Sequence, residues 1–180
     1  MEKQNYSTPI FIFIRYIILL CLVLSLAVIY KILTPITLFS TAGLLGFIYE
    51  TATLNDFIII NKSIVIQIIP ACVAGSAYLL LLILNLSTQM NIKKRIYSIV
   101  FSVIMLFVIN IIRIFILSML LINEFRFFDL THKVLWYGLS IVFVVGIWFL
   151  TAYLFKVKDI PVYSDFKYFI KGIAKKTLKK

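Results

Sequence analysis

Three side chains with the chemistry of acyl transfer stand out in an otherwise apolar sequence: Cys72, Arg113 and His132. A cysteine can serve as a nucleophile, a histidine as a general base, and an arginine as a cation that stabilises an oxyanion. Each lies in or beside a different one of three consecutive apolar segments. If those segments are membrane helices, the charges of the loops place all three residues toward the same face. We therefore expect them to form one cysteine acyl-transfer site that needs no cofactor.

The surroundings of Cys72 and Arg113 favour such a role. Cys72 lies in the first turn of a helix predicted to begin at Pro70, where the helix dipole favours a thiolate. Arg113 lies in the apolar run FVINIIRIFILSMLLI, where a charge costs roughly 2.5–3.5 kcal/mol and needs compensating contacts. Asn110, three residues earlier on the same helical face, is expected to orient its guanidinium. The structural alternatives are packing for Cys72, and hydrogen bonds from Arg113 to helix carbonyls.

His132 is the only histidine, and it follows two candidate N-cap residues, Asp129 and Thr131. It is expected to open the last helix at about the level of Cys72. A weaker alternative site uses Ser76 as the nucleophile, with His132 and Asp129. Two cysteines and one histidine are too few for a zinc site built from those ligands alone, so we expect no metal.

The composition requires a membrane around these segments. The chain has 180 residues, of which 63% are hydrophobic and only 14% charged. A soluble domain of this length cannot bury so much apolar surface. The net charge of +11 fits basic residues at the cytoplasmic side of a membrane better than nucleic-acid binding, because eight of the 18 Lys and Arg lie after residue 155.

The apolar runs predict an all-α polytopic membrane bundle of about five transmembrane helices. The four prolines all fall near the edges of the runs, where a missing backbone donor is tolerated. The predicted helices span residues 10–33, 35–51, 70–88, 96–121 and 132–155.

The remaining segments predict topology and domains. Residues 51–69 are rich in β-branched side chains and indicate a short extended outer element, such as a hairpin, before the third helix. The basic cluster 93–95 and the tail 156–180 both mark the cytoplasmic side, so five helices place the N-terminus outside and the C-terminus inside. We thus expect a transmembrane transpeptidase-like domain, 1–155, and a basic cytoplasmic tail, 156–180. Either an interfacial amphipathic helix or a solvated segment fits that tail.

These residues resemble those of the exosortase and archaeosortase family of membrane-embedded cysteine transpeptidases, over about residues 34–155. The resemblance is carried by ACVAG around Cys72, by NIIRI around Arg113, by His132 with Gly138 after it, and by the β-branched stretch before the cysteine. The order Cys, Arg, His across successive helices is its specific part.

The chain departs from the family directly after the cysteine. The family often has Ser and Gly there, whereas this chain has Val73 and Ala74. The surroundings of the oxyanion are therefore expected to differ.

The resemblance implies a function and partners. In the family, the cysteine is the proposed nucleophile, and arginine and histidine assist it. Membrane-anchored exported proteins with a C-terminal sorting signal are cleaved through a thioester acyl-enzyme, and the new C-terminus passes to an acceptor, which the sequence does not identify. The resemblance thus implies a multi-pass protein of the cell membrane, in contact with lipids, with its site near the extracytoplasmic face. The alternatives are a non-catalytic multipass assembly or scaffold protein, and a small transporter component.

Overall fold

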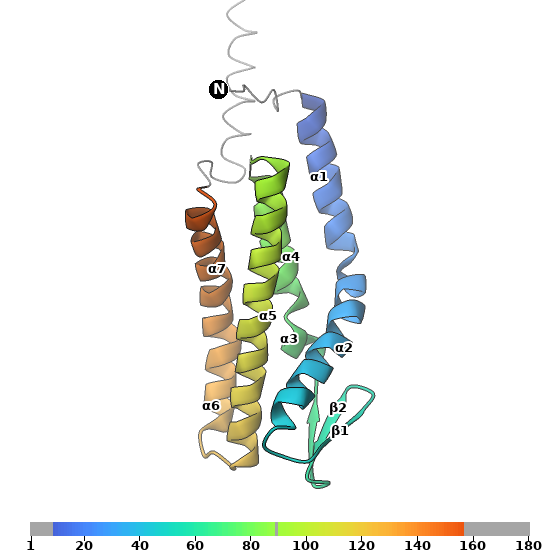
Figure 1. The fold of residues 1–180 in the computed structure, drawn as a ribbon, viewed down its shortest axis with the longest axis vertical. Helices are drawn as coiled ribbons and strands as arrows, with labels where there is room; N and C mark the ends of the chain where they lie inside the picture. The colour runs from blue at the N-terminus through green and yellow to red at the C-terminus, as the bar shows by residue number, and fades with distance from the viewer. Residues whose placement is uncertain (1–8, 89, 157–180) are drawn as a thin grey trace, which may run out of the picture.

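The computed structural model describes residues 9–88 and 90–156, which form a bundle of helices with a small sheet at one end (Figure 1). We call this the sheet end of the bundle. The helices are α1 (Pro9–Leu24), α2 (Leu26–Leu45), α3 (Pro70–Val73), α4 (Gly75–Ser87), α5 (Ile92–Ile122), α6 (Phe128–Lys133) and α7 (Ser140–Leu154), with a π-helix, η1 (Val134–Leu139), between the last two.

Four helical stretches are long and apolar enough to cross a membrane: Leu26–Leu45, Pro70–Ser87, Ile92–Ile122 and Phe128–Leu154. A hydrocarbon core about 30 Å thick needs roughly 20 such residues. Large apolar side chains point outward along the described helices, among them Phe39 on α2 and Phe149 on α7, which are 63% and 62% exposed. Such surfaces are typical of helices that face lipid rather than water.

The first part of the bundle differs from the five-helix prediction. Pro35 lies inside α2, so the predicted helix boundary at residues 33–35 is wrong. Proline is tolerated in the interior of membrane helices because nearby groups compensate for the missing donor. The actual boundary, at Ser25, hardly interrupts the backbone, since the amide of Ser25 donates to the carbonyl oxygens of Cys21 and Leu22 at 3.0 and 3.2 Å.

This boundary changes the predicted topology. α1 and α2 run one after the other in the same direction, so the helices make four passes along the bundle in the part of the chain described (Figure 1). The start of α1 and the end of α7 consequently lie at the same end of the bundle, opposite the sheet. This arrangement differs from the predicted one, in which five helices place the N-terminus outside and the C-terminus inside.

The extended element predicted for residues 51–69 is confirmed, and it has three strands. β1 (Thr51–Leu54), β2 (Phe57–Ile60) and β3 (Ile64–Gln67) form an antiparallel sheet in the order β1-β2-β3. Ile58 and Ile60 of β2 are fully buried, and they pack with Leu38 and Leu45 of α2 in an apolar core at the sheet end. The central strand thus supplies the two fully buried side chains of the sheet, and β1 adds a hydrogen bond from the hydroxyl of Thr51 to the carbonyl oxygen of Ala42 in α2.

The later helices lie close to their predicted positions. The third predicted helix begins at Pro70, as expected, but Ala74 divides it into α3 and α4. The fourth corresponds to α5. The fifth begins at Phe128 rather than at residue 132, and continues through α6, η1 and α7. Beyond Lys156, the predicted basic tail lies outside the described residues.

A buried polar cluster joins three helices away from the sheet. The amide nitrogen of Asn85 on α4 donates to the hydroxyl of Ser102 on α5 at 3.3 Å, and Ser102 lies 3.0 Å from the hydroxyl of Thr151 on α7. Ser98 of α5 also donates to the side-chain oxygen of Asn85. All four residues are almost fully buried. Their hydrogen bonds connect helices whose contacts are otherwise mainly apolar.

Candidate active site

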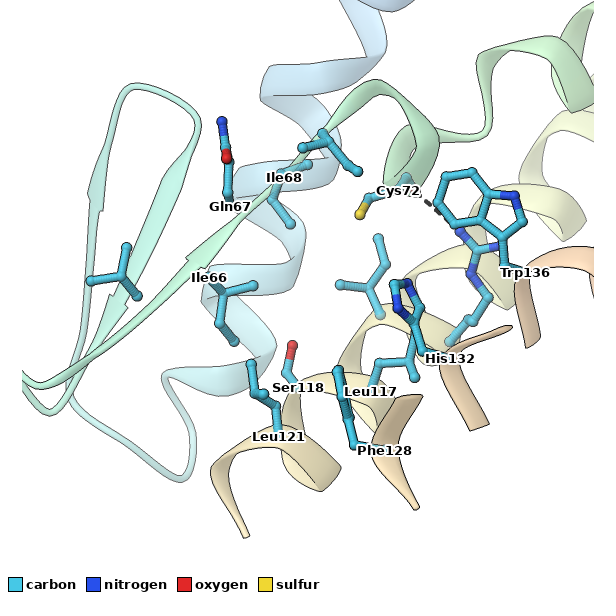
Figure 2. Close-up of a pocket in the computed structure, with 14 residues that line it drawn as sticks. Ile66, Gln67, Ile68, Cys72, Leu117, Ser118, Leu121, Phe128, His132 and Trp136 are labelled. Carbon is cyan, nitrogen blue, oxygen red and sulfur yellow. Dashed lines mark hydrogen bonds between the residues drawn. The ribbon is translucent and has the colours of Figure 1, made fainter. Parts of the chain in front are cut away.

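Cys72 lies at the point where the sheet meets the bundle. After β3, Ile69 remains extended and Pro70 opens α3, so that the amide of Cys72 donates to the carbonyl oxygen of Ile69 at 2.8 Å. Proline suits this first helical position because its nitrogen needs no partner there. Cys72 is a free, half-buried cysteine. Its sulfur points into the space between β3 and the helices (Figure 2).

The helix stops after Val73, the residue that follows Cys72, because Ala74 adopts the left-handed conformation, with φ 58° and ψ 34°. An L-residue pays roughly 1–2 kcal/mol for this conformation, whereas glycine adopts it freely. The break also leaves the carbonyls of Cys72 and Val73 without partners from the next helical turn, and in a membrane such groups need other donors.

Asn110 and Arg113 of α5 supply these donors. The side-chain nitrogen of Asn110 donates to the carbonyl oxygen of Cys72 at 2.8 Å and to that of Val73 at 3.5 Å. Nη2 of Arg113 also donates to the Cys72 oxygen, at 3.4 Å. Asn110 was predicted to orient the guanidinium; instead its amide contacts the same carbonyl as Arg113. Both residues therefore hold the backbone of Cys72.

Arg113 has a second acceptor that the sequence did not indicate. Its Nη1 donates to the hydroxyl of Ser140 at 2.9 Å, and that hydroxyl donates to the carbonyl oxygen of Leu135 at 3.0 Å. Only 9% of Arg113 is exposed, and its Nε has no acceptor among the described residues. The guanidinium thus joins α5 to the short helix of Cys72 and to the start of α7, which partly offsets the cost of a buried charge.

His132 lies within α6 rather than at the start of a helix. The N-cap residue of α6 is Phe127 and no side chain caps it, so the predicted capping by Asp129 or Thr131 is wrong. The imidazole stacks on the ring of Phe128, with centroids 5.7 Å apart, and meets the edge of Trp136 at 6.0 Å. Among the described residues no hydrogen bond engages its nitrogens. Two aromatic rings, each four residues away along the chain, therefore position the imidazole.

The π-helix helps to keep this face aligned. In an α-helix, residues four apart drift by about 40° per step around the axis. Trp136 lies within η1. The wider turn of this π-helix, with its i→i+5 bonding, counteracts the drift between Trp136 and Ser140. His132, Trp136 and Ser140 consequently all lie against the α3–α5 region, the first two at the cavity with Cys72 and the third bonded to Arg113.

One cavity of about 220 Å³ brings the three predicted residues together. Figure 2 shows the sulfur of Cys72 and the imidazole of His132 facing the same space. Arg113 also lines the cavity, and no hydrogen bond joins Cys72 to His132 in the described part of the chain. The remaining lining is mainly apolar: Val65, Ile66, Gln67, Ile68, Ile69, Ile114, Leu117, Ser118, Leu121, Phe128 and Trp136.

The alternative serine site is not brought together in this way. Ser76 lines a different cavity, of about 350 Å³, on which neither His132 nor Asp129 lies. Arg113 and Trp136 reach both cavities. Of the two predicted nucleophiles, Cys72 and Ser76, it is Cys72 that shares a cavity with the imidazole.

The residues that sequence analysis missed, Ser140, Phe128 and Trp136, act on the predicted ones. Phe128 and Trp136 lie four residues before and after His132, a spacing that places side chains on one helical face and was available as a signal. Ser140 has no comparable signal, because its contact with Arg113 joins two different helices.

Comparison with known proteins adds no relative to this geometry: no family model, no curated protein sequence and no solved structure matches the chain.

Proposed function

We propose that this chain is a membrane-embedded cysteine peptidase and transpeptidase of the exosortase and archaeosortase type, acting on exported proteins with a C-terminal sorting signal. One observation carries the proposal. A free thiol, an imidazole and a guanidinium, from α3, α6 and α5, line a single apolar cavity beside the sheet. A nucleophile, a base and a cation on one cavity wall are the parts that acyl transfer needs.

In the proposed reaction, the thiol proton of Cys72 moves to a ring nitrogen of His132 and the sulfur attacks the carbonyl carbon of the scissile peptide bond. The tetrahedral intermediate then collapses, the C–N bond breaks, and His132 returns the proton to the leaving amine. The product is a thioester on Cys72. An acceptor nucleophile attacks this thioester in transfer, or water attacks it in hydrolysis, and either reaction regenerates the thiol.

Arg113 is the proposed donor to the oxyanion. Arginine carries five N–H groups. Two of these bond to Ser140 and to the Cys72 carbonyl, and a third, on Nε, is buried without an acceptor. One N–H on each terminal nitrogen therefore remains for the substrate. A well-placed donor of this kind contributes about 3–4 kcal/mol to transition-state stabilisation.

The charges support an extracytoplasmic site. Lys93, Lys94 and Arg95 lie at the start of α5, at the end of the bundle opposite the sheet (Figure 1). Basic loop residues mark the cytoplasmic side, so the sheet end, with Cys72, faces away from the cytoplasm. The substrate's own hydrophobic helix then lies in the lipid beside the bundle, and its cleavage site reaches the cavity at the membrane surface.

Co-expression with a protein that carries a C-terminal sorting signal tests the proposal. We expect the unmodified chain to remove the C-terminal helix of the substrate, the Cys72→Ala variant to lose this activity, and the matched Cys21→Ala variant to keep it. His132→Ala should reduce the rate by about 10²- to 10⁴-fold, as for other general bases. The mass of the new C-terminus distinguishes hydrolysis from transfer. Equal processing by Cys72→Ala, at equal expression, would overturn the proposal.

A non-catalytic scaffold is the second candidate, and one observation favours it. Asn110 and Arg113 satisfy backbone carbonyls freed by the break at Ala74, which is a purely structural task. Cys72→Ala separates the two functions. It removes the thiol and leaves the backbone carbonyls bonded to Asn110 and Arg113, so a peptidase loses its activity, whereas a scaffold keeps its assembly.

A further inference from the structure

The sheet has an open edge beside the candidate nucleophile. β3 pairs with β2 on one side, and no strand pairs with its other side in the part of the chain that the structure describes. Residues 65–69 all line the cavity, and Cys72 follows three residues later. The open edge of β3 thus leads along the cavity wall to the thiol.

The hydrogen-bond pattern identifies which residues face this edge. The amide of Ile68 donates to the carbonyl oxygen of Asp56 at 2.8 Å, which continues the β2–β3 ladder. Backbone groups alternate between the two sides of a strand. Ile64 and Ile66 therefore bond to β2, while the N–H and C=O groups of Val65 and Gln67 point to the open edge.

The open edge is accessible to a further strand. Val65 and Gln67 are exposed, and open sheet edges attract further strands. The cavity beside Val65 and Gln67 is walled mainly by apolar side chains, such as Ile114, Leu117 and Leu121. An extended peptide is the ligand that satisfies both features, because its backbone pairs with the edge and its side chains meet the apolar wall.

The other edge of the sheet lacks these features. The amide of Asn61 donates to the carbonyl oxygen of Glu50 at 2.9 Å, so by the same alternation Thr51 and Thr53 face outward from β1. No residue of β1 lines the cavity that contains Cys72. Thr53 therefore offers a matched control: the same kind of edge, in the same sheet, away from the thiol.

We infer that β3 binds the substrate in extended form, as a fourth strand of the sheet, and thereby presents a peptide carbonyl to Cys72. The inference rests on the proposed function and specifies its mode of substrate recognition. Val65 and Gln67 each provide one N–H and one C=O group, which allows up to four backbone hydrogen bonds. The two residues lie about 7 Å apart along the strand. Main-chain pairing of this kind supplies affinity with little dependence on the substrate's side chains.

Two alkylating probes of different length test the inference in a Cys21→Ser background. The short probe is chloroacetamide. The long probe is an acetylated five-residue peptide of alternating Val and Thr that ends in a chloromethyl ketone. Each forms a bond from the sulfur of Cys72 to carbon and releases chloride, and intact-protein mass spectrometry follows both reactions. The measured quantity is the ratio of the long-probe rate to the short-probe rate.

Gln67→Pro removes one outward N–H and leaves the β2 ladder intact. We expect this substitution to lower the rate ratio about tenfold, the effect of losing one backbone hydrogen bond and leaving its partner unsatisfied. Thr53→Pro, at the opposite edge, should change the ratio less than twofold. Equal ratios in both variants would overturn the inference.

N-methylated probes repeat the test without changing the protein. Two versions of the long probe carry N-methyl groups, one at its odd-numbered residues and one at its even-numbered residues. One version should react more slowly than the unmethylated probe and the other should not, because only every second residue pairs with β3. A uniform response would overturn the inference while the nucleophile stands. If neither probe modifies Cys72 in folded protein, the proposed function itself fails, and the strand-addition inference with it.

Discussion

Replacing Asn110 by aspartate separates two roles for this residue. In the structure, its amide nitrogen donates to the Cys72 carbonyl at 2.8 Å, and a carboxylate cannot make this bond. If Asn110 served instead to orient Arg113, three residues later on α5, aspartate would do so at least as well, since the two charges would pair. The structure therefore predicts a severe effect of Asn110→Asp, and the orienting role predicts a mild one.

The size of the effect follows from burial and from the lost bond. Removing the partner of a buried carbonyl costs about 1–3 kcal/mol in the free energy of unfolding. Asn110 is only 3% exposed, so burying a carboxylate there adds a further penalty. Asn110→Ala incurs the first cost alone. Both variants release the backbone of Cys72, and displacing a reacting group by about 1 Å lowers rates up to about a hundredfold.

The assay combines thermal unfolding in detergent with the rate of Cys72 alkylation in a Cys21→Ser background. We expect the unmodified protein to be the most stable, Asn110→Ala to be less stable and Asn110→Asp to be the least stable. The alkylation rate should fall at least about tenfold in both variants. Asn85→Asp is the matched control, because it places the same substitution in the buried polar cluster away from the site. It should destabilise the protein but lower the alkylation rate of Cys72 less than Asn110→Asp does, because Asn85 bonds Ser98 and Ser102 and not the backbone of Cys72. An Asn110→Asp variant as stable and reactive as its parent would refute the reasoning.

Substitutions at Ala74, Gly75 and Ser140 test three local features by thermal unfolding. Ala74→Gly should stabilise the protein by about 1 kcal/mol and Ala74→Val should destabilise it, because glycine alone adopts φ 58° freely; equal stabilities would contradict this backbone conformation. Gly75→Val brings a Cβ to within 2.6 Å of the Tyr30 ring and should cost about 1–3 kcal/mol. Tyr30→Ala should recover most of that loss, whereas additive effects would argue against the contact. Ser140→Ala removes the 2.9 Å acceptor of Arg113 and should cost about 1.5–3 kcal/mol, and Ser140→Thr should cost much less.

Sequence analysis succeeded where the signals are local. Proline at the first helical position marked the start of α3, and with it the place of Cys72. The β-branched run at residues 51–69 indicated extended structure. Cys72, Arg113 and His132 all follow this run, so the error at Pro35 did not affect their relative positions. That is why the expectation of a shared location survived a wrong boundary between the first two helices.

Sequence analysis failed where the outcome depends on contacts between distant segments. Pro35 was expected at a helix edge, but a membrane helix can continue through proline. Asn110 was paired with Arg113 because the two are near neighbours on one helix, yet its partner lies on α3. The Cys72 carbonyl is free to accept this bond only because Ala74 breaks the helix. Alanine is common inside helices, so its presence in the sequence does not predict a helix break.

The polar cluster of Asn85, Ser98, Ser102 and Thr151 determines where along α5 each later residue lies. Apolar helix faces alone allow a long helix to slide or rotate, whereas these hydrogen bonds fix the axial position and the rotation of α5 relative to α4 and α7. Asn110 lies eight residues beyond Ser102, about 12 Å along the axis. One residue inserted between them would shift Arg113 by about 1.5 Å and turn it by about 100°, so the site tolerates changes of side chain on this stretch far better than changes in its length.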